Sequence, residues 1–581
     1  MIREHLRRMA SLLTATALLA AAPASVWANG DDKTLNERIS NERLLSEKNT
    51  GKGTQPVTPT TATPIKNVVV IFQENISFDH YFATYPYATN PVTETPFTAK
   101  ANTPTVDTLL SGGLLTSNPN STQPFRMDPV MSVTCDQNHS YTPEQSAFDH
   151  GLMDKFPENT GSGNPGGASA CNDYGKGTGV VMGYFDGNAV TALWNYAQYY
   201  AMSDNSHGTM FGPSAVGALN LIAGTTSLAT LQASADGTKT PTTGAKGTAL
   251  GNIGNGLTQT TGAAIGDPRP FYDDCVATDP TTSDLYSKIR ISVSGKNVGD
   301  LLNAKGLTWG WFQGGFAPTG TSTSTAPWQA GLPVCGAHTR GLAGDDAITT
   351  SGDYIPHHEP FQYFSQSNNQ AHTRPSDSGL IGTSSDGANH QYDLQDFWTA
   401  LEEDRLPTVT YLKAAAYQDG HPGYSDPLDE QNFVVDVVNA LENSKYWPTL
   451  AIIIAYDDSD GWYDHALGPI VNQSAVSDDT LAGPGSCGSS STNTQGQCGY
   501  GPRLPLLVIS PYAKQNYVDH VATDQSSILR FIEDNWSLGR IGGNSSDVKA
   551  GTLNGLFDFS DKNRAPKLIL DDSTGTILQQ N

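Results

Sequence analysis

Three short segments of the chain consist almost entirely of aliphatic and β-branched residues. They are NVVVIF at 67–72, LAIIIAY at 450–456 and LPLLVIS at 504–510. A strand with one face in water alternates apolar and polar residues, whereas a strand in the centre of a parallel sheet is apolar along its whole length. We therefore predict three strands that are buried on both faces of one sheet.

A helical pattern lies between the first and the second of these segments, directly before the second. In EQNFVVDVVNALENS at 430–444, apolar residues recur at spacings of three and four, which places on one helix face Phe433, Val434, Val437, Val438 and Leu441. Strands that alternate with helices indicate an α/β fold with a central, mostly parallel sheet flanked by helices. Ligands bind beyond the carboxyl ends of the strands in such sheets.

Acidic and amide side chains follow two of the predicted strands. Glu74 and Asn75 follow the first, and Asp457, Asp458 and Asp460 follow the second. Neither stretch contains a Lys or Arg, and buried carboxylates without a counter-charge are costly. A divalent cation is the predicted counter-charge, and oxygen ligands suit Mg, Ca or Mn without ranking them. The alternative is that these acids are solvated loop residues or helix caps.

Four histidines lie in polar loops that Gly and Pro interrupt. They are His139 in TCDQNHSYTPEQ, His357 and His358 in DYIPHHEPF, and His421 in YQDGHPGYSDPLDEQ. Each alone is commonly a surface residue. Together, they are predicted to supply the cations and proton donors that the handling of an oxyanion requires.

A candidate nucleophile is Ser214, which follows Gly212 and Pro213 and begins the apolar, small-residue segment SAVGALNLIAG. This segment is predicted to be helical. At a helix N-terminus, backbone N–H groups and the helix dipole favour a bound anion such as phosphate. The alternative is that Ser214 is an ordinary N-cap.

Several catalytic motifs are missing from the sequence. There is no G-x-S-x-G elbow, P-loop, H-E-x-x-H pair or dinucleotide-binding fingerprint. Their absence disfavours serine esterases, nucleotide-binding proteins and zincins. The chemistry that remains is the hydrolysis of a tetrahedral ester by a hydroxyl group with the help of a metal ion.

Composition limits the partners of the protein. The chain has 581 residues, 58 of them Gly and 35 Pro, and a formal net charge of −25. Such a protein is loop-rich, and its negative charge repels nucleic acids and anionic bilayers at long range. We therefore expect a small or locally captured substrate and no nucleic-acid partner.

The N-terminal residues 1–28 resemble an export signal. Arg3, Arg7 and Arg8 precede an apolar run that ends in small residues near Ala28, where we predict cleavage and release of a periplasmic or secreted protein. The choice between the Sec and twin-arginine routes stays open. An uncleaved anchor is the alternative, but the run is shorter than the ~20 residues of a membrane span. No transmembrane segment is predicted in the mature chain.

Six cysteines in an exported chain predict disulfides. They are Cys135, Cys171, Cys275, Cys335, Cys487 and Cys498. The best single pairing joins Cys487 to Cys498 across the short loop CGSSSTNTQGQC. The sequence contains no C-x-x-C spacing, so the cysteines do not indicate a metal site.

Seven blocks of the sequence carry a family resemblance. In chain order they are NVVVIFQENISFDHYF, TCDQNHSYTPEQSAFDHGLMDKF, MGYFDGNAVTALWNYAQYYAMSDN, FGPS, PHHEPFQYF, AIIIAYDDSDGWYDH and GPRLPLLVISPYAK. They resemble the bacterial acid phosphatase and phospholipase C family within the alkaline-phosphatase superfamily. The resemblance implies an alkaline-phosphatase-like α/β fold with loop-rich insertions.

We accordingly divide the chain into a signal peptide (1–28), a flexible leader (29–64), a phosphoesterase catalytic domain (65–560) and a C-terminal tail (561–581). Residues from about 225 to 350, where the resemblance is patchy, are predicted to be rich in insertions. We favour a surface excursion over a substrate-facing insertion for the Gly/Thr/Ser-rich stretch at 226–251.

The resemblance also implies a site. One divalent metal ion would be held by Glu74, Asn75, Asp457 and Asp458, with Ser214 as both ligand and nucleophile. The resemblance also implies that four histidines surround the phosphoryl group: His139, His357, His358 and His421. Of these, His139 or His421 would be the acid that protonates the leaving oxygen. Attack by Ser214 would give a phosphoserine that water then cleaves. We expect Asp460, Asp464 and His465 to contact these residues from behind without binding the metal or the substrate themselves.

Within the family, GPSAVGALNL is closer to the acid phosphatase branch than to the choline-phospholipid enzymes, which tend to carry GPT followed by Asn-Arg. We therefore rank a phosphomonoesterase first and a phospholipase C acting on phospholipids second. A sulfatase is disfavoured because the sequence has no Cys-x-Pro-x-Arg motif. A non-catalytic exported binding protein is the alternative of a different class, and metal-dependent turnover would separate the two.

Overall fold

The computed structural model describes residues 60–129, 134–162, 175–232, 261–277, 290–325, 329–339, 352–476, 478–481, 487–488, 496–560 and 566–581. The predicted signal peptide, the predicted leader up to residue 59 and most of the stretch at 226–251 lie outside these residues. Within them, no helix combines the length and the apolar character that crossing a membrane requires.

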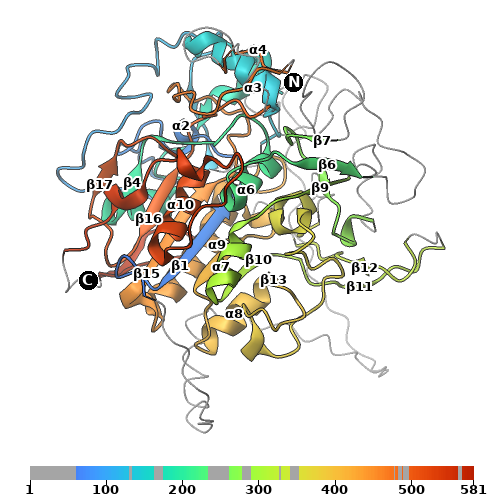
Figure 1. Ribbon diagram of the computed structural model, residues 1–581. Coiled ribbons are helices and arrows are strands. Elements are labelled where there is room, and N and C mark those ends of the chain that lie inside the picture. The colour runs from blue at the N-terminus through green and yellow to red at the C-terminus, as the bar shows by residue number, and fades with distance from the viewer. Residues whose placement is uncertain are drawn as a thin grey trace, which may run out of the picture. The chain divides into compact units, whose positions relative to one another are not determined.

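The core of the fold is an eight-stranded sheet with helices on both faces (Figure 1). In spatial order its strands are β13 (Gln391–Asp393), β10 (Trp309–Gln313), β14 (Val409–Lys413), β1 (Asn67–Gln73), β15 (Leu450–Tyr456), β16 (Leu506–Ile509), β4 (Ala201–Ser203) and β17 (Tyr517–Asp519). All neighbours pair in parallel except β16, which is antiparallel to both β15 and β4. The predicted α/β fold with a mostly parallel sheet is confirmed.

The apolar runs predicted burial correctly. Every residue of β1 and β15 is buried, and the two strands pair in register from Asn67 with Leu450 to Gln73 with Tyr456. The expectation that the run at 504–510 is a parallel strand is wrong, because β16 is antiparallel. A strand covered on both faces is apolar whatever its direction, so the pattern reports burial and not orientation.

The helices among the described residues are α2 (Phe78–Phe82), α3 (Tyr141–Phe148), α4 (Phe156–Asn159), α5 (Thr191–Tyr199), α6 (Ser214–Ala223), α7 (Val298–Lys305), α8 (Leu394–Glu402), α9 (Pro427–Asn443) and α10 (Gln525–Trp536). In Figure 1, α6 and α10 lie in front of the sheet and α9 lies behind it. The apolar face predicted for α9 is buried throughout. This helix begins where the Asp426 carboxylate accepts the N–H groups of Leu428 and Asp429.

The region from 225 to 350 contains more than insertions. It supplies α7 and β10, and β10 is a fully buried strand of the central sheet between β13 and β14. It also forms a separate four-stranded sheet from β7 (Thr261–Gly262), β6 (Ala229–Gln232), β9 (Arg290–Val293) and β8 (Arg269–Pro270). This part of the chain therefore contributes to the central sheet.

Four two-stranded sheets complete the described part of the chain: β2 (Phe125–Arg126) with β3 (Gly183–Tyr184), β5 (Ser206–His207) with β18 (Thr523–Asp524), β11 (Gly320–Thr321) with β12 (Pro333–Val334), and β19 (Leu568–Leu570) with β20 (Ile577–Gln580). The last pair lies in the segment that we expected as a tail. It is fastened to α9, because Asn439 Nδ2 donates to Leu570 O at 2.8 Å and Leu568 N donates to Glu442 Oε2 at 2.7 Å.

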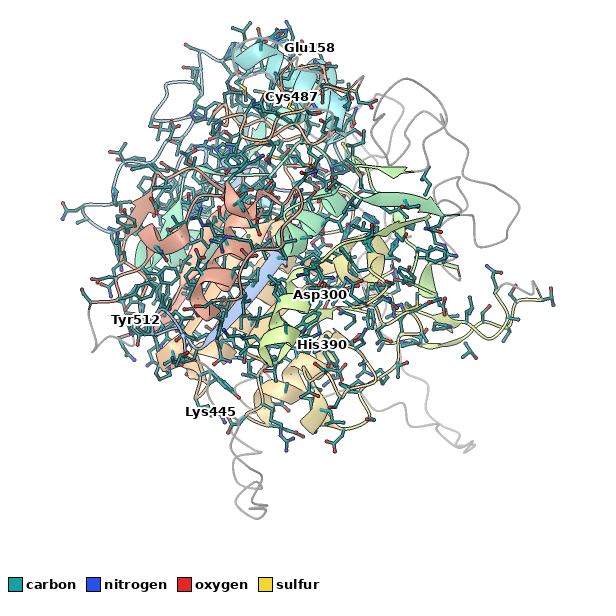
Figure 2. All side chains as sticks on the ribbon, viewed as in Figure 1. Glu158, Asp300, His390, Lys445, Cys487 and Tyr512 are labelled. Atoms are coloured by element: carbon teal, nitrogen blue, oxygen red, sulfur yellow. A yellow bond between two sulfur atoms is a disulfide. The ribbon has the colours of Figure 1, made fainter. Side chains whose placement is uncertain are left out.

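Disulfides link the loops. The predicted pairing of Cys487 with Cys498 is confirmed, with their Cα atoms 5.1 Å apart. Figure 2 labels Cys487, whose neighbour Gln145 belongs to α3. Cys275 pairs with Cys335, with their Cα atoms 5.6 Å apart, and Cys135 is also disulfide-bonded.

Candidate active site

The chain makes a tight turn where it leaves β1 at the carboxyl edge of the sheet. Asn75 has φ of +60°, in the left-handed region that Asn tolerates better than most residues. Its N–H donates to Asp457 Oδ1 at 2.9 Å, and the N–H of Glu74 donates to the carbonyl of Asp419 at 2.8 Å. The ends of β1 and β15 are thereby locked together.

The turn after β15 is held by its own carboxylates. Asp457 Oδ1 also accepts the N–H of Asp458 at 2.7 Å, and Asp458 Oδ1 accepts the N–H of Asp460 at 2.6 Å. Asp460 itself has φ of +53°. These bonds use Oδ1 of Asp457 and of Asp458, so Oδ2 of each remains for other contacts.

Helix α6 brings Ser214 to these acids. A Cβ at Gly217 would collide with the carbonyl oxygen of Asp457, so glycine permits the close approach of α6 to the end of β15. Ser214 is the first residue of the helix, and the N-cap is Pro213. The alternative that Ser214 is an N-cap is therefore wrong, and its hydroxyl points to the acids instead.

Three acceptor oxygens surround the Ser214 hydroxyl. Its Oγ lies 2.9 Å from Asp458 Oδ2, 3.0 Å from Glu74 Oε2 and 3.2 Å from Asn75 Oδ1. One hydroxyl proton is donated to only one acceptor at a time, so hydrogen bonding cannot hold all four oxygens together. A group of carboxylate, amide and hydroxyl oxygens is a typical ligand set for a hard divalent cation.

The charge of this group also calls for a cation. Asp457 Oδ2 is buried without a hydrogen-bond partner. Burial, followed by the neighbouring Glu74 carboxylate, raises the pKa of Asp457 to about 8. Burial and the adjacent Asp457 raise the pKa of Asp458 well above its usual range. The residues present therefore fit a divalent metal ion.

One cation near the site comes from the protein itself, which the sequence analysis missed. Lys413, the last residue of β14, forms a buried ion pair with Glu74 Oε1. His358 Nδ1 lies 3.0 Å from the same oxygen. Glu74 thus directs Oε1 to Lys413 and His358 and Oε2 to Ser214. Neither acidic stretch contains a Lys or Arg, and the basic partner comes instead from Lys413, which is remote in sequence from both.

A cavity of ≈ 250 Å³ opens beside Ser214. It is lined by Asp136, His139, Ser214, Asp267, Arg269, Gly352, Tyr354, Ile355, Pro356, His357, His421 and Tyr424. Three of the four predicted histidines thus share a cavity with the predicted nucleophile. The fourth, His358, lies against Glu74.

The histidines differ in charge. Burial opposes the charged form of His139, but the carboxylates of Asp458, Asp460 and Asp136 raise its pKa well above the usual value. Burial and neighbouring cations lower the pKa of His357 and of His358 well below the usual value. Within the set that was predicted to supply cations and proton donors, these directions favour His139 as a cation and His357 and His358 as neutral groups.

Glu144 was missed as a residue that supports the site. Its Oε2 accepts the N–H of Gly212 at 2.9 Å, and its Oε1 accepts the hydroxyl of Ser459 at 2.8 Å. Burial raises the pKa of this carboxyl to about 7. Glu144 thus connects the turn before Ser214 to the turn after β15. It lies in a sequence block that marked the family, but its helical context gives no sign of this role.

The residues expected behind the site separate into two groups. Asp460 does lie there, because its Oδ1 accepts Asn75 Nδ2 at 3.2 Å and lies 3.2 Å from His139 Nδ1. Asp464 and His465 instead contact a buried ion-pair cluster. Asp464 Oδ1 lies 3.1 Å from Arg503 Nε, and His465 Nδ1 lies 2.6 Å from Asp79 Oδ2. Arg503 therefore provides a positive charge beside the carboxylates of Asp79 and Asp464.

Known proteins share parts of this sequence. The non-hemolytic phospholipase C of Pseudomonas aeruginosa is 31% identical over 181 residues, which are 29% of this chain and 26% of that protein. Phospholipase C A of Mycobacterium tuberculosis is 30% identical over 142 residues, which are 24% of this chain and 26% of that protein. The matches therefore span about a quarter of the length of these curated relatives.

Among solved structures, a protein in the alkaline phosphatase superfamily from Vibrio parahaemolyticus is 10% identical, with a match over 93% of this chain and 83% of that chain. The TM-score is 0.27, too low to support an argument, and the fold described above rests on the sheet itself.

A sequence profile of the Phosphoesterase family matches residues 65–539, which is most of the chain. The matched range includes every predicted site residue, from Glu74 to Asp458. It also agrees with the resemblance seen in the seven sequence blocks. The chain belongs to the Phosphoesterase family.

Proposed function

We propose that this protein is an exported, metal-dependent phosphoesterase that hydrolyses phosphate monoesters through a phosphoserine on Ser214. The observation that carries the proposal is the position of the Ser214 hydroxyl. Three acceptor oxygens lie within 3.2 Å of it, and it faces a cavity that histidines and an arginine line.

The metal ligands would be the oxygens of Glu74, Asn75, Asp457, Asp458 and Ser214. A divalent cation bound there would neutralise the carboxylates, lower the pKa of the Ser214 hydroxyl and polarise the phosphoryl group. The proposal assigns one such ion, and the oxygen-rich donor set suits Mg, Mn or Ca.

The protein residues would act in two steps. Ser214 Oγ releases its proton to solvent and attacks phosphorus, and the bond from phosphorus to the leaving oxygen breaks. His139 is the better candidate for the acid that protonates this oxygen, because its neighbouring carboxylates favour the charged imidazolium. His357, His421 and Arg269 line the cavity where the other phosphoryl oxygens would lie. Water then cleaves the phosphoserine.

The size of the cavity favours a small substrate. Its volume of ≈ 250 Å³ is below the ~300–1,000 Å³ typical of pockets for drug-sized ligands. A phosphoryl group with a small alcohol fits such a space, whereas a diacylglycerol would have to extend out of it. The cavity therefore supports the monoesterase.

Phospholipase C activity is the second candidate. It is favoured by the names of the curated relatives, because both of those described above are phospholipases C. A phospholipid would have to leave its diacylglycerol outside the cavity and place only the headgroup phosphate beside Ser214. The two candidates share the same nucleophile and metal ligands and differ in the leaving group.

The test compares p-nitrophenyl phosphate with p-nitrophenylphosphorylcholine between about pH 5 and 8, with and without a chelator. The purified mature protein and Ser214→Ala are assayed side by side. Faster cleavage of the monoester, abolished by Ser214→Ala and by the chelator, would support the proposal. Preference for the choline diester would favour the phospholipase. If neither compound is cleaved with any metal, the proposal is wrong and a binding protein is favoured.

A further inference from the structure

Arg269 is a half-buried cation in the wall of the active-site cavity. Its Nη1 lies 2.5 Å from Nδ1 of His357, which lines the same cavity. No carboxylate of the described residues forms an ion pair with its guanidinium within 4.0 Å. Asp267, two positions earlier, accepts the N–H of Ala215 at 2.9 Å instead. The only polar group that the described part of the chain offers to Arg269 is thus an imidazole nitrogen.

The backbone holds Arg269 in this position. The two flanking residues, Pro268 and Pro270, each have a restricted φ. The Tyr363 hydroxyl donates to the carbonyl oxygen of Pro268 at 2.5 Å, and Tyr363 follows His357 by six positions. The segment that carries the guanidinium is therefore fastened to the segment that carries the imidazole.

The contact determines where the proton of His357 lies. A guanidinium has only N–H donors and does not lose its proton in proteins. Nδ1 of His357 must therefore accept, which requires a bare nitrogen. A neutral imidazole with a bare Nδ1 carries its proton on Nε2. The direction of the pKa of His357, which burial, His358 and Arg269 lower, agrees with a neutral ring.

We propose that Arg269 is a positioning residue that holds His357 neutral with its proton on Nε2, so that His357 donates one N–H to an oxygen of the bound phosphoryl group. His357 is then a hydrogen-bond donor and not the acid that protonates the leaving group. The inference rests on the proposed function, because a phosphoryl group must occupy the cavity for this donor to have an acceptor.

The first experiment reads the tautomer without turnover. The full mature protein is labelled with ¹⁵N-histidine, and the resonances of His357 are identified by their loss in His357→Gln. The N–H and bare nitrogens of a neutral imidazole have well separated shifts. We expect Nε2 to be protonated and Nδ1 bare in the wild type, and a mixture of states in Arg269→Met, which keeps a long side chain but has no donor. Protonated Nδ1 in the wild type would overturn the inference.

The second experiment is a double-mutant cycle with p-nitrophenyl phosphate. Arg269→Met should lower kcat/KM by about 10- to 100-fold, because a donor to the phosphoryl oxygen is lost. The side-chain amide of glutamine places an N–H donor near the position that Nε2 of His357 occupies. Unlike an imidazole, it has no tautomers, so it needs no neighbour to fix the position of its proton. In the His357→Gln background, Arg269→Met should therefore cause no further loss.

The matched control is Arg290→Met. Arg290 pairs in register with Arg269 on the neighbouring strand β9, and it is not among the residues that line the cavity. We expect its kcat/KM to stay at the wild-type value. A further loss from Arg269→Met in the His357→Gln background would mean that Arg269 contacts phosphate directly, and the positioning role would be wrong. A wild type that cleaves no phosphate ester would overturn the proposed function, while the tautomer of His357 would still be read from its resonances.

Discussion

The Ser214 hydroxyl lies 2.9 Å from Asp458 Oδ2, although 244 positions separate the two residues in the chain. The contact exists because α6 approaches the end of β15 closely at Gly217. It places a hydroxyl from a helix N-terminus among acids from two strands. Ser214 is 1% exposed and its hydroxyl makes no helix-capping bond, which agrees with the proposed role as nucleophile.

Ser214→Ala should abolish turnover without unfolding the protein. Loss of the nucleophile should lower kcat by at least about 10³-fold, as for other catalytic nucleophiles. The hydroxyl does not cap the helix, so the midpoint of thermal unfolding measured with chelator should change little. Steady-state kinetics and circular dichroism check the two expectations.

Ser510→Ala is the matched control for this variant. Ser510 is equally buried, and its hydroxyl donates to the carbonyl of Leu450 at 2.7 Å, away from the cavity. We expect its kcat to stay close to the wild-type value. Activity in Ser214→Ala above about a tenth of the wild type would contradict the assigned nucleophile.

Arg503→Met should be strongly destabilising. The guanidinium is fully buried and contacts Asp79 Oδ1 at 3.3 Å and Asp464 Oδ1 at 3.1 Å. Without it, two buried carboxylates lose their cation, which costs about 3–5 kcal/mol. Urea unfolding should show the loss as a lower midpoint.

The control for Arg503 is Arg374→Met, which removes an exposed guanidinium from a pair with Asp396. The Arg374 side chain is 40% exposed and its Nη2 lies 2.7 Å from Asp396 Oδ1. Because solvent reaches the guanidinium and the N–H of Asp393 still donates to Asp396 Oδ2, the expected cost is smaller than for Arg503, about 1 kcal/mol. Equal losses in the two variants would show that the buried cluster is not the special feature that we infer.

The extent to which the sequence predicts this structure depends on the range of each signal. The strands β1 and β15 and the helix α9 were predictable because burial and periodicity are local patterns. The acids after β1 and β15 were predictable because the carboxyl ends of parallel strands share an edge. The direction of β16 was not, since both orientations bury the same apolar run.

Polar contacts between distant segments were the part that could not be predicted. Lys413, Glu144 and Arg269 each reach the site from a different part of the chain, and no pattern around them marks a partner. The same holds for the charge of the histidines. His139 and His357 lie in similar loops, and only their neighbours in space raise the pKa of His139 and lower the pKa of His357.

Glu442 should make the stability depend on pH. Burial, partly offset by the bonds from Tyr200 and Leu568, raises the pKa of Glu442 to about 8. A carboxyl whose pKa is higher in the folded state contributes its full stability below about pH 4.5, its unfolded pKa, and loses it as the pH rises through about 8. Between these values the decline is at most ~1.4 kcal/mol per pH unit.

Glu442→Gln should remove this part of the pH dependence. An amide stays neutral, and Tyr200 can turn its hydroxyl to the carbonyl of Pro566, 3.4 Å away, and accept the amide N–H. Urea unfolding of the wild type and the variant from about pH 5 to 8 should therefore give a smaller slope for Glu442→Gln. Parallel curves would show that Glu442 does not stay protonated in the folded protein.

A bound divalent cation should stabilise the protein, and Asp458→Asn should reverse the order of stability between variants. In chelator the wild type keeps Glu74, Asp457 and Asp458 crowded together, so Asp458→Asn should unfold at higher urea. With metal at ~100 times its Kd, the wild type should gain about 2.7 kcal/mol and the variant much less, because one oxygen ligand is replaced.

Asp464→Asn is the control in the same loop, since its carboxylate pairs with Arg503. It should lose stability in both conditions and keep the full gain from metal. If the wild type gains nothing from Mg, Mn or Ca, the oxygens around Ser214 do not form a metal site.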